Sequence, residues 1–327
     1  MNLKQSSIRA RMLIIVLFIS INSFACDGCN VYVNFSPIDY KNRISIIGRT
    51  RMMYGTYNMF GTQILTKHAS HGNDPLFWNN DVQENYNTLE LRGAFYVREV
   101  WKTTVIVPFV NNHQLIGNLS RYEINGIADP IVIETYQVFN SLKSNDSNRF
   151  KHRLEIGGGV KFPLGKIDKR YENGIPNLDL QPGTGSLDFI SSVSYMTRIK
   201  KYGAILNANI KLNGYNRDDY KYGNTFNSTI NLFRQTTMGN FTFMPLVGGY
   251  FEFMSLDKSR YESNGNSVVI DYNDTGGAIL FGTIGSKVFY KTLSLFIDYQ
   301  HRVYSKLNGY TQLLTKNRIN VGLTYSL

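Results

Sequence analysis

The sequence predicts an all-β protein, a single transmembrane antiparallel up-and-down β-barrel of about twelve strands. Three observations lead to this fold class. Segments that alternate apolar and polar residues recur from residue 43 onward, the connections between them alternate between long and short, and the first 25 residues have the pattern of an export signal. Because backbone amides find no water partners in hydrocarbon, a sheet that spans a membrane must close on itself.

Residues 1–25 are expected to be a secretory signal peptide. Basic residues precede an uncharged run from Met12 to Phe24, and Ala25 lies at the cleavage position, which is the order of regions in such peptides. The mature chain would then begin at Cys26. Lipidation of Cys26 is the alternative, although Ser23 occupies the position where an aliphatic residue is expected.

Residues 26–42 are expected to form an N-terminal periplasmic segment with a CxxC motif, Cys26 and Cys29. A local disulfide is the expected state of this pair, because exported proteins meet an oxidising compartment. A redox or metal-binding tip is the alternative. The residue directly after Cys29 is Asn30 and not histidine, and the sequence has no second cysteine pair, which excludes the patterns of haem attachment and of a zinc site. We therefore expect no metal and no cofactor.

The net charge of +11 does not point to a nucleic-acid partner. Three of these charges belong to the signal peptide, and the other lysines and arginines are scattered through alternating segments and loops, whereas a nucleic-acid interface gathers them on one face. The later run without charge at residues 235–251 is too short and too polar for a membrane helix. The charges are therefore expected inside the barrel and on its surfaces.

The expected strands follow one another from residue 43 to residue 326. The first six cover residues 43–57, 84–97, 102–111, 124–138, 150–163 and 186–199. The other six cover residues 201–213, 222–237, 239–253, 275–290, 291–303 and 316–326. Most are longer than the roughly 9 to 11 residues that a tilted transmembrane strand needs, so their ends can extend beyond the membrane.

Alternation of apolar and polar residues justifies these segments. In 84–97, leucines and aromatic residues interleave with Glu90 and Arg92; in 150–163, apolar residues interleave with Arg153 and Glu155. Segment 186–199 begins after a loop that Pro182 and its neighbouring glycines define, and then alternates an apolar face with a polar one that carries Ser192 and Ser194. Segments 201–213 and 316–326 follow the same period of two, which indicates strands with one apolar and one polar face.

Two segments, 124–138 and 275–290, have no clear parity, so Glu134 and Lys287 are assigned to neither face.

The connections sort by length along the chain. The long ones are residues 58–83, 112–123, 164–185 and 254–274. The short ones are residues 98–101, Lys200, Met238 and the Tyr290–Lys291 junction. Long extracellular loops and short periplasmic turns are typical of an outer-membrane barrel, whereas a soluble sandwich has no reason to sort its loops in this way.

The polar faces of the strands are expected to line the lumen. The candidates are Arg49, Arg51, Glu90, Arg92, Arg153, Glu155, Lys161 and Lys211, with Asp298 as a further one. A narrow path with this basic excess would favour anionic or polar solutes. The alternative is a structural or adhesive barrel in which the same charges pair and close the lumen.

The apolar faces are expected to contact outer-membrane lipid. Tyr195, Tyr250, Tyr299 and Tyr325 lie near the ends of expected strands, where aromatic girdles meet the membrane interfaces. The barrel-assembly machinery is the other expected partner, because the last strand keeps its apolar parity to Leu327.

Three stretches of the chain share glycines, prolines and an aspartate at loop and strand-end positions: "GIADPIV" at 126–132, "GGGVKFPLGK" at 157–166 and "LQPGTGSLDF" at 180–189. They resemble motifs of a family of outer-membrane barrel transporters that includes proteins of the meta pathway of phenol degradation. Ala128 replaces the second glycine of the first motif, and Leu164 replaces the usual threonine of the second. The residues expected to shape these loops and strand ends are Gly126, Asp129, Pro130, Pro163, Gly165, Pro182, Gly183 and Gly185.

The resemblance implies a place in the outer membrane of a Gram-negative bacterium and uptake of small, often hydrophobic or aromatic, compounds. The sequence therefore predicts a porin-like channel or transporter for solutes that are either polar and anionic or hydrophobic and aromatic.

An outer-membrane hydrolase is the remaining alternative. His68, Ser70, His71 and Asp74 lie close together in the sequence, and their types suit a nucleophile with its base or a metal site. They fall in an expected loop, however, and a nucleophile needs its base held at hydrogen-bond distance by a rigid scaffold. A solvated loop explains the cluster without either chemistry, so we expect the protein not to be an enzyme.

Overall fold

This computed structural model describes residues 41–56, 81–116, 119–142, 150–167, 180–263, 265–273, 275–308 and 314–327. The expected signal peptide, the CxxC pair Cys26 and Cys29, and the stretch from His68 to Asp74 lie outside these residues. The described part of the chain holds no helix of the length and apolarity needed to cross a membrane.

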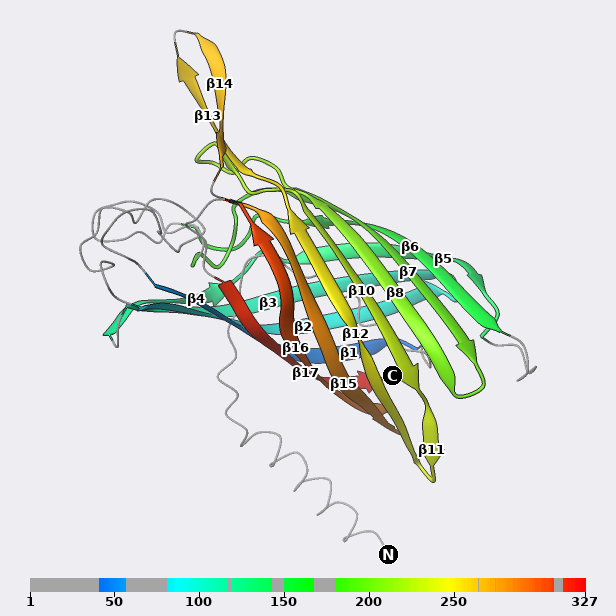
Figure 1. The fold of residues 1–327 in the computed structure, drawn as a ribbon. Coiled ribbons are helices and arrows are strands. Elements are labelled where there is room, and N and C mark those ends of the chain that lie inside the picture. The colour runs from blue at the N-terminus through cyan, green and yellow to red at the C-terminus, as the bar shows by residue number, and fades with distance from the viewer. Residues whose placement is uncertain are drawn as a thin grey trace, which may run out of the picture.

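The chain forms a closed antiparallel barrel with twelve strand positions in its wall (Figure 1). The strands of the wall are β1 (Arg43–Thr56), β2 (Asp81–Arg98), β3 (Trp101–Ile116), β4 (Leu119–Ile127), β5 (Ile131–Asn140), β6 (Lys151–Lys161), β7 (Asp188–Ile199), β8 (Tyr202–Leu212), β10 (Thr225–Arg234), β11 (Thr236–Met238), β12 (Phe241–Met254), β15 (Gly277–Tyr290), β16 (Leu293–Leu307) and β17 (Leu314–Ser326). β4 and β5 share one wall position, and β10 and β11 share another. β1 pairs with β17 and β10 with β12, which closes the wall. The predicted fold class is confirmed.

Side chains alternate across the wall with the predicted period of two. On β8, Leu206, Ile210 and Leu212 are exposed on the outer surface, whereas Asn207 and Lys211 are buried. Lipid can solvate an apolar outer surface, and the opposite face then carries the polar residues. The barrel therefore presents its apolar side chains to the outer membrane and its polar side chains to its own interior.

Tight turns join the strands at one end of the barrel. Lys200 and Lys291 have φ values of 50° and 53°, and Gly239 has φ 58°. Positive φ values are typical of the short hairpin turns whose twist matches that of the strands. These turns are the predicted periplasmic ones, and the longer connections lie at the other end.

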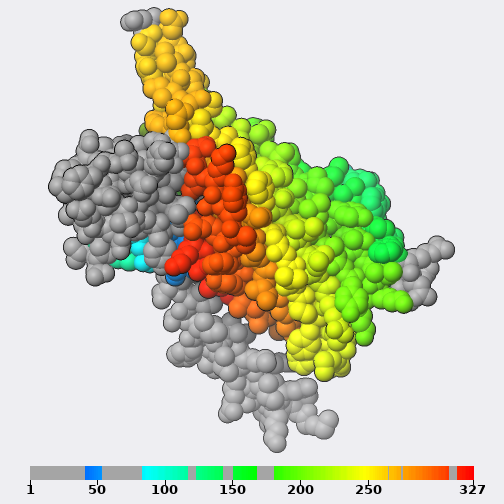
Figure 2. Space-filling model, in the orientation of Figure 1, coloured from blue at the N-terminus to red at the C-terminus, as the bar shows by residue number. Residues whose placement is uncertain are grey.

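Two predicted long loops are largely strand, and those two predictions are wrong. In the first, residues 112–123, β3 runs on to Ile116 and β4 already begins at Leu119. In the second, residues 254–274, the strands β13 (Asp257–Ser263) and β14 (Asn266–Tyr272) form a hairpin that stands out from the barrel (Figures 1 and 2). The alternation of apolar and polar residues does not identify these strands, because strands above the membrane need no apolar face. Backbone pairing alone holds them in register.

Polar contacts fix the base of this extracellular hairpin, those of Asp257 buried and that between Arg260 and Asp219 exposed. The Tyr220 hydroxyl, on the short strand β9 (Tyr220–Lys221), donates to Asp257 at 2.7 Å, and the Gly223 amide donates to the same carboxylate at 2.6 Å. Arg260 donates to Asp219 at 2.6 Å, and this hydrogen bond raises the pKa of the Arg260 guanidinium. The hairpin is thus an anchored extension of the barrel rim.

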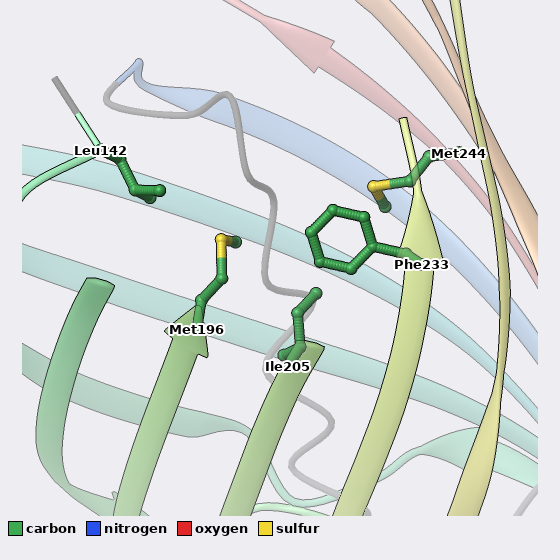
Figure 3. Packing of buried hydrophobic residues seen from close by; sticks show 5 residues of the cluster. All are labelled: Leu142, Met196, Ile205, Phe233 and Met244. Atoms are coloured by element: carbon green, nitrogen blue, oxygen red, sulfur yellow. The ribbon is translucent and has the colours of Figure 1, made fainter. Parts of the chain in front are cut away.

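A small apolar cluster lies inside the barrel, near the periplasmic turns. Met196 on β7, Ile205 on β8, Phe233 on β10 and Met244 on β12 project into the same space, together with Leu142 from the chain after β5 (Figure 3). All five are buried. The alternation of the sequence did not predict this cluster, because it treated the inward face as polar throughout.

Candidate functional site: the barrel interior

Basic residues outnumber acidic ones on the inward face of the described strands and the segment between β4 and β5. The basic residues include Arg43, Arg49, Arg51, Arg92, Lys102, Arg153, Lys161, Lys211, Lys287, Arg302 and Arg318. The acidic residues are Glu84, Glu90, Asp129, Glu155, Asp188, Glu252 and Asp298. The eight residues predicted to line the lumen, and Asp298, all lie on this face; that they guide a solute stays a prediction.

Glu90 on β2 links two arginines of neighbouring strands. Arg49 Nη2 on β1 lies 3.1 Å from Glu90 Oε2, and Arg92 Nη2 lies 2.5 Å from the same oxygen. One carboxylate therefore faces two guanidinium groups. Because the pairs lie out of bulk water, their attraction is stronger than that of surface pairs.

Glu155 on β6 has a similar position between two cations. Lys102 Nζ on β3 lies 2.7 Å from Glu155 Oε2, and Arg153 Nε lies 3.3 Å from Glu155 Oε1. Arg153 is the cross-strand partner of Met196, so this charged group borders the apolar cluster of Figure 3. Near the periplasmic turns the interior thus has a cationic wall beside an apolar one.

Asp129 is the centre of a third buried group, which unites the three motif stretches. Lys161 Nζ lies 2.7 Å from Asp129 Oδ2 and 2.9 Å from Asp188 Oδ2. The Gly165 amide donates to Asp129 Oδ1 at 2.9 Å, and the Thr184 amide donates to Oδ2 at 2.8 Å. Lys161 also contacts the Thr184 hydroxyl. The sequence placed Lys161 in the lumen and Asp129 at a strand end, but it did not bring the two together.

This group holds residues 180–186 against the inner face of β3 and β4. Asn112 Nδ2, buried on the inward face of β3, donates to the Leu180 carbonyl at 3.1 Å. Pro182 packs on Gly126, where an added Cβ would lie 3.3 Å from the proline ring. Leu180, Gln181 and Ser186 are all buried. Residues 180–186, the part of this loop next to β7, therefore fold into the barrel.

The remaining motif residues shape the chain around this segment. Pro130 lies in the gap between β4 and β5, where it has no amide hydrogen to give to the ladder, and its carbonyl accepts from the Phe162 amide at 2.9 Å. Pro163 is exposed just after β6. A Cβ added to either Gly165 or Gly183 would lie 2.7 Å from the Cα of the other, which leaves no room for a side chain, and Gly185 has φ +70°.

Tyr250 is not in an interfacial girdle, and that prediction is wrong. It is 1% exposed and points inward, where its hydroxyl donates to Glu252 Oε2 at 2.6 Å. Its parity matches that of Glu252 two residues later, which is the signal that could have placed it inside. Tyr299 and Tyr325 are exposed on the outer surface, and Tyr195 is half-buried there, with its hydroxyl 2.7 Å from His152 Nδ1.

Several inward charges were not assigned from the sequence. Arg43, Lys102 and Glu252 lie near strand ends, where alternation is weakest, and Lys287, in a strand of unclear parity, is buried inside. Arg318 lies on the polar face that the alternation of 316–326 predicts, but it is not among the residues predicted to line the lumen. Glu134, the other unassigned residue, is exposed on the outside and accepts from the Thr103 hydroxyl at 2.7 Å.

The described residues contain no group of three or more His, Cys, Asp and Glu side chains that could hold a metal ion. The cluster His68, Ser70, His71 and Asp74, which carried the hydrolase alternative, lies outside them.

No family model matches the chain, and no curated protein is similar to it in sequence. Among solved structures, it is similar to an outer membrane channel from Pseudomonas putida F1, with 11% identity and a TM-score of 0.60 over 90% of this chain and all of that one. The β domain of the Bordetella autotransporter BrkA has 9% identity and a TM-score of 0.44, over 88% of this chain and all of that one. The first similarity shows the fold, that of an outer-membrane β-barrel.

Proposed function

We propose that the protein is an outer-membrane channel for small polar anions. The observation that carries this proposal is the excess of arginine and lysine over aspartate and glutamate on the inward face of the described barrel. A narrow passage with low-dielectric walls focuses the field of its charges and raises the local concentration of solutes with the opposite sign. Rings of basic side chains favour anions in pores for this reason.

Lys211 gives the sharpest test of the channel. It is buried on the inward face of β8, and no ion pair involves it among the described residues, so Lys211→Gln removes a cation without exposing a partner carboxylate. Purified protein in planar bilayers, with a KCl gradient across the membrane, should show a reversal potential of the sign expected for chloride preference. We expect Lys211→Gln to shift that potential toward zero.

Lys258→Gln is the matched control, because Lys258 lies on the exposed β13–β14 hairpin, away from the interior. It should leave the reversal potential unchanged. Folded protein that gives no conductance above the bare bilayer would refute the channel.

A path for hydrophobic or aromatic solutes is the second candidate. The apolar cluster of Met196, Ile205, Phe233, Met244 and Leu142 favours it, since these side chains line the interior rather than the lipid face (Figure 3). We also infer kinship with the family of meta-pathway outer-membrane transporters, because its three motif stretches meet around Asp129. Uptake of radiolabelled phenol by cells with and without the gene tests this candidate; equal rates would contradict it.

A structural or adhesive barrel with a sealed interior is the third candidate. The inward-folded residues 180–186 and the paired charges around Asp129 support it. The bilayer measurement separates it from both channels, because a sealed barrel conducts no ions.

We infer that the last strand, β17, is read by the barrel-assembly machinery. Tyr325 and Leu327 are exposed on its outer face. Replacing both with Asp should reduce insertion into the outer membrane, measured as the folded fraction in membrane extracts.

A further inference from the structure

We propose that Arg51 and Arg318 form a binding site for a small oxyanion, one that carries a carboxylate or a phosphate group, in the extracellular half of the barrel interior. This inference deepens the proposed anion channel and rests on it, since a permeating anion would reach the site from the lumen. The site combines an opposed pair of cations, aromatic side chains that hold them, and hydrogen-bond donors with no protein partner.

The two arginines are direct cross-strand neighbours. Arg51 on β1 pairs with Arg318 on β17 in the register of the barrel, and both point inward. Like charges directly opposite each other destabilise an antiparallel pair. Glu252 offsets part of this repulsion, because its Oε2 lies 3.1 Å from Arg318 Nη2. The donors that Arg318 does not direct at Glu252 favour an anion at this place.

Aromatic rings hold both guanidinium groups. Arg51 Cζ lies 4.9 Å from the centre of the Tyr86 ring, and Arg318 Cζ lies 4.3 Å from the Phe281 ring and 5.1 Å from the Tyr250 ring. Stacking on a ring face attracts the cation and leaves the edge of the guanidinium free for hydrogen bonds.

The two tyrosines are themselves fixed in matching ways. The Tyr86 hydroxyl donates to Glu84, and the Tyr250 hydroxyl donates to Glu252 at 2.6 Å, in each case to a carboxylate two residues away on the same strand. The rings, and therefore the stacked guanidinium groups, have little freedom before a ligand arrives. Pre-organisation of this kind lowers the entropy lost on binding.

Arg318 has hydrogen-bond donor atoms that no protein group uses. Its side chain crosses the interior from β17 to β12, where Nη2 lies 3.1 Å from Glu252 Oε2. Its Nε and Nη1 atoms are buried and have no hydrogen-bond partner in the protein, and the residue is 6% exposed. Buried donors without partners are costly and uncommon, and the oxygen atoms of a carboxylate or phosphate are the acceptors that guanidinium groups bind best.

Solvent reaches this level of the interior. Arg51, and Arg49 two residues before it on the same face, both keep partial exposure. Of the two arginines, Arg51 is therefore the one that solvent reaches more easily, since Arg318 is 6% exposed.

Equilibrium binding tests the site independently of conductance. The full chain, folded in detergent micelles, is titrated with sodium phosphate and with sodium acetate at constant ionic strength, and the heat of binding is measured. We expect saturable binding of at least one of the two. Arg51→Gln should weaken it by about tenfold or more, the effect of losing one charge-assisted hydrogen bond.

Arg318 needs a paired variant, because removing it alone leaves Glu252 buried without its cation. The double variant Arg318→Gln, Glu252→Gln keeps the local charge balanced and should fold while losing the same affinity. Lys211→Gln is the matched interior control: it removes a cation from a different wall strand and should change the affinity by less than about twofold.

Two results would contradict the proposed binding site. The first is that the unmodified protein shows no saturable binding. The second is that Lys211→Gln loses as much affinity as Arg51→Gln, which would mean that the barrel attracts anions only through its total charge. Failure of the site is distinguishable from failure of the channel. If the protein conducts anions without binding phosphate or acetate, the channel proposal stands and the binding-site proposal is wrong. If it binds one of them without conducting, the channel proposal is wrong and the binding site stands.

Discussion

Around Asp129 a buried ammonium group lies between two carboxylates, whereas Arg318, although paired with Glu252, faces a second cation, Arg51, on the neighbouring strand. Lys161 lies between Asp129 and Asp188, and backbone amides complete the shell of Asp129. At the arginine pair, by contrast, Arg318 uses one of its donor atoms and leaves two without protein partners. Buried charges therefore have two roles inside this barrel. Where the hydrogen-bonding atoms of a charged group have protein partners, the group stabilises the fold. Where donor atoms have no protein partner, they remain available to a ligand.

The largest expected effect comes from breaking the satisfied group. Lys161→Met leaves Asp129 and Asp188 buried without their shared cation, and loss of one partner of a buried ion pair costs about 3–5 kcal/mol. Unfolding by urea in detergent should show a loss of this size. Bilayer conductance of the surviving folded protein should rise, because residues 180–186 lose their anchor.

Lys161→Arg is the control for that change, since it keeps the positive charge and should lose far less stability. If Lys161→Met costs under about 1 kcal/mol, the Asp129 group is not the structural element described above.

The second prediction concerns the close approach of two loops beside Asp129. A Cβ on Gly183 would lie 2.6 Å from Asp129 Oδ1 and 2.7 Å from Gly165 Cα, so Gly183→Ala must displace one of them. Overpacking of this kind costs about 1–3 kcal/mol. Gly158→Ala is the matched control, because nothing lies within 4 Å of its added Cβ; equal stability of the two variants would contradict the close packing.

A smaller effect is expected at the unsatisfied region. Tyr250→Phe removes the hydroxyl that donates to Glu252, which should reduce the free energy of unfolding by about 1 kcal/mol. It should also weaken phosphate binding, since the ring that carries Arg318 loses its fixed position. Tyr325→Phe, at an exposed tyrosine on the outer surface, should alter neither quantity; a phosphate affinity that survives Tyr250→Phe unchanged would argue against the aromatic support.

The smallest effect belongs to the extracellular hairpin. Lys258 and Asp271 form an ion pair at 3.0 Å with side chains 39% and 46% exposed. Exposed pairs contribute at most about 1 kcal/mol, so Lys258→Ala should change the urea midpoint little, and less still in high salt. If Lys258→Ala lost as much free energy of unfolding as Lys161→Met, buried and exposed ion pairs would contribute equally in this protein, which would contradict the comparison.

Most of the wall could be predicted because its code is local. The alternation that places Leu206 outside and Lys211 inside repeats every two residues, and lipid on one side with polar contacts on the other imposes that period on every spanning strand. The same code missed the extracellular hairpin around Lys258, where water on both faces removes the constraint. It also misplaced Tyr250, which is expected at a membrane interface from its distance to the strand end, whereas its parity with Glu252 puts it on the inward face.

The sequence by itself determined the closed antiparallel barrel and the face on which each clear strand turns its charges, because both follow from backbone hydrogen bonding in lipid and a period of two. Only the tertiary structure decided that Asp129 meets Lys161, that residues 180–186 fold inward, and that Arg51 stands opposite Arg318. These contacts depend on the register between strands far apart in the chain, and register is set by the closure of the whole barrel rather than by any one segment.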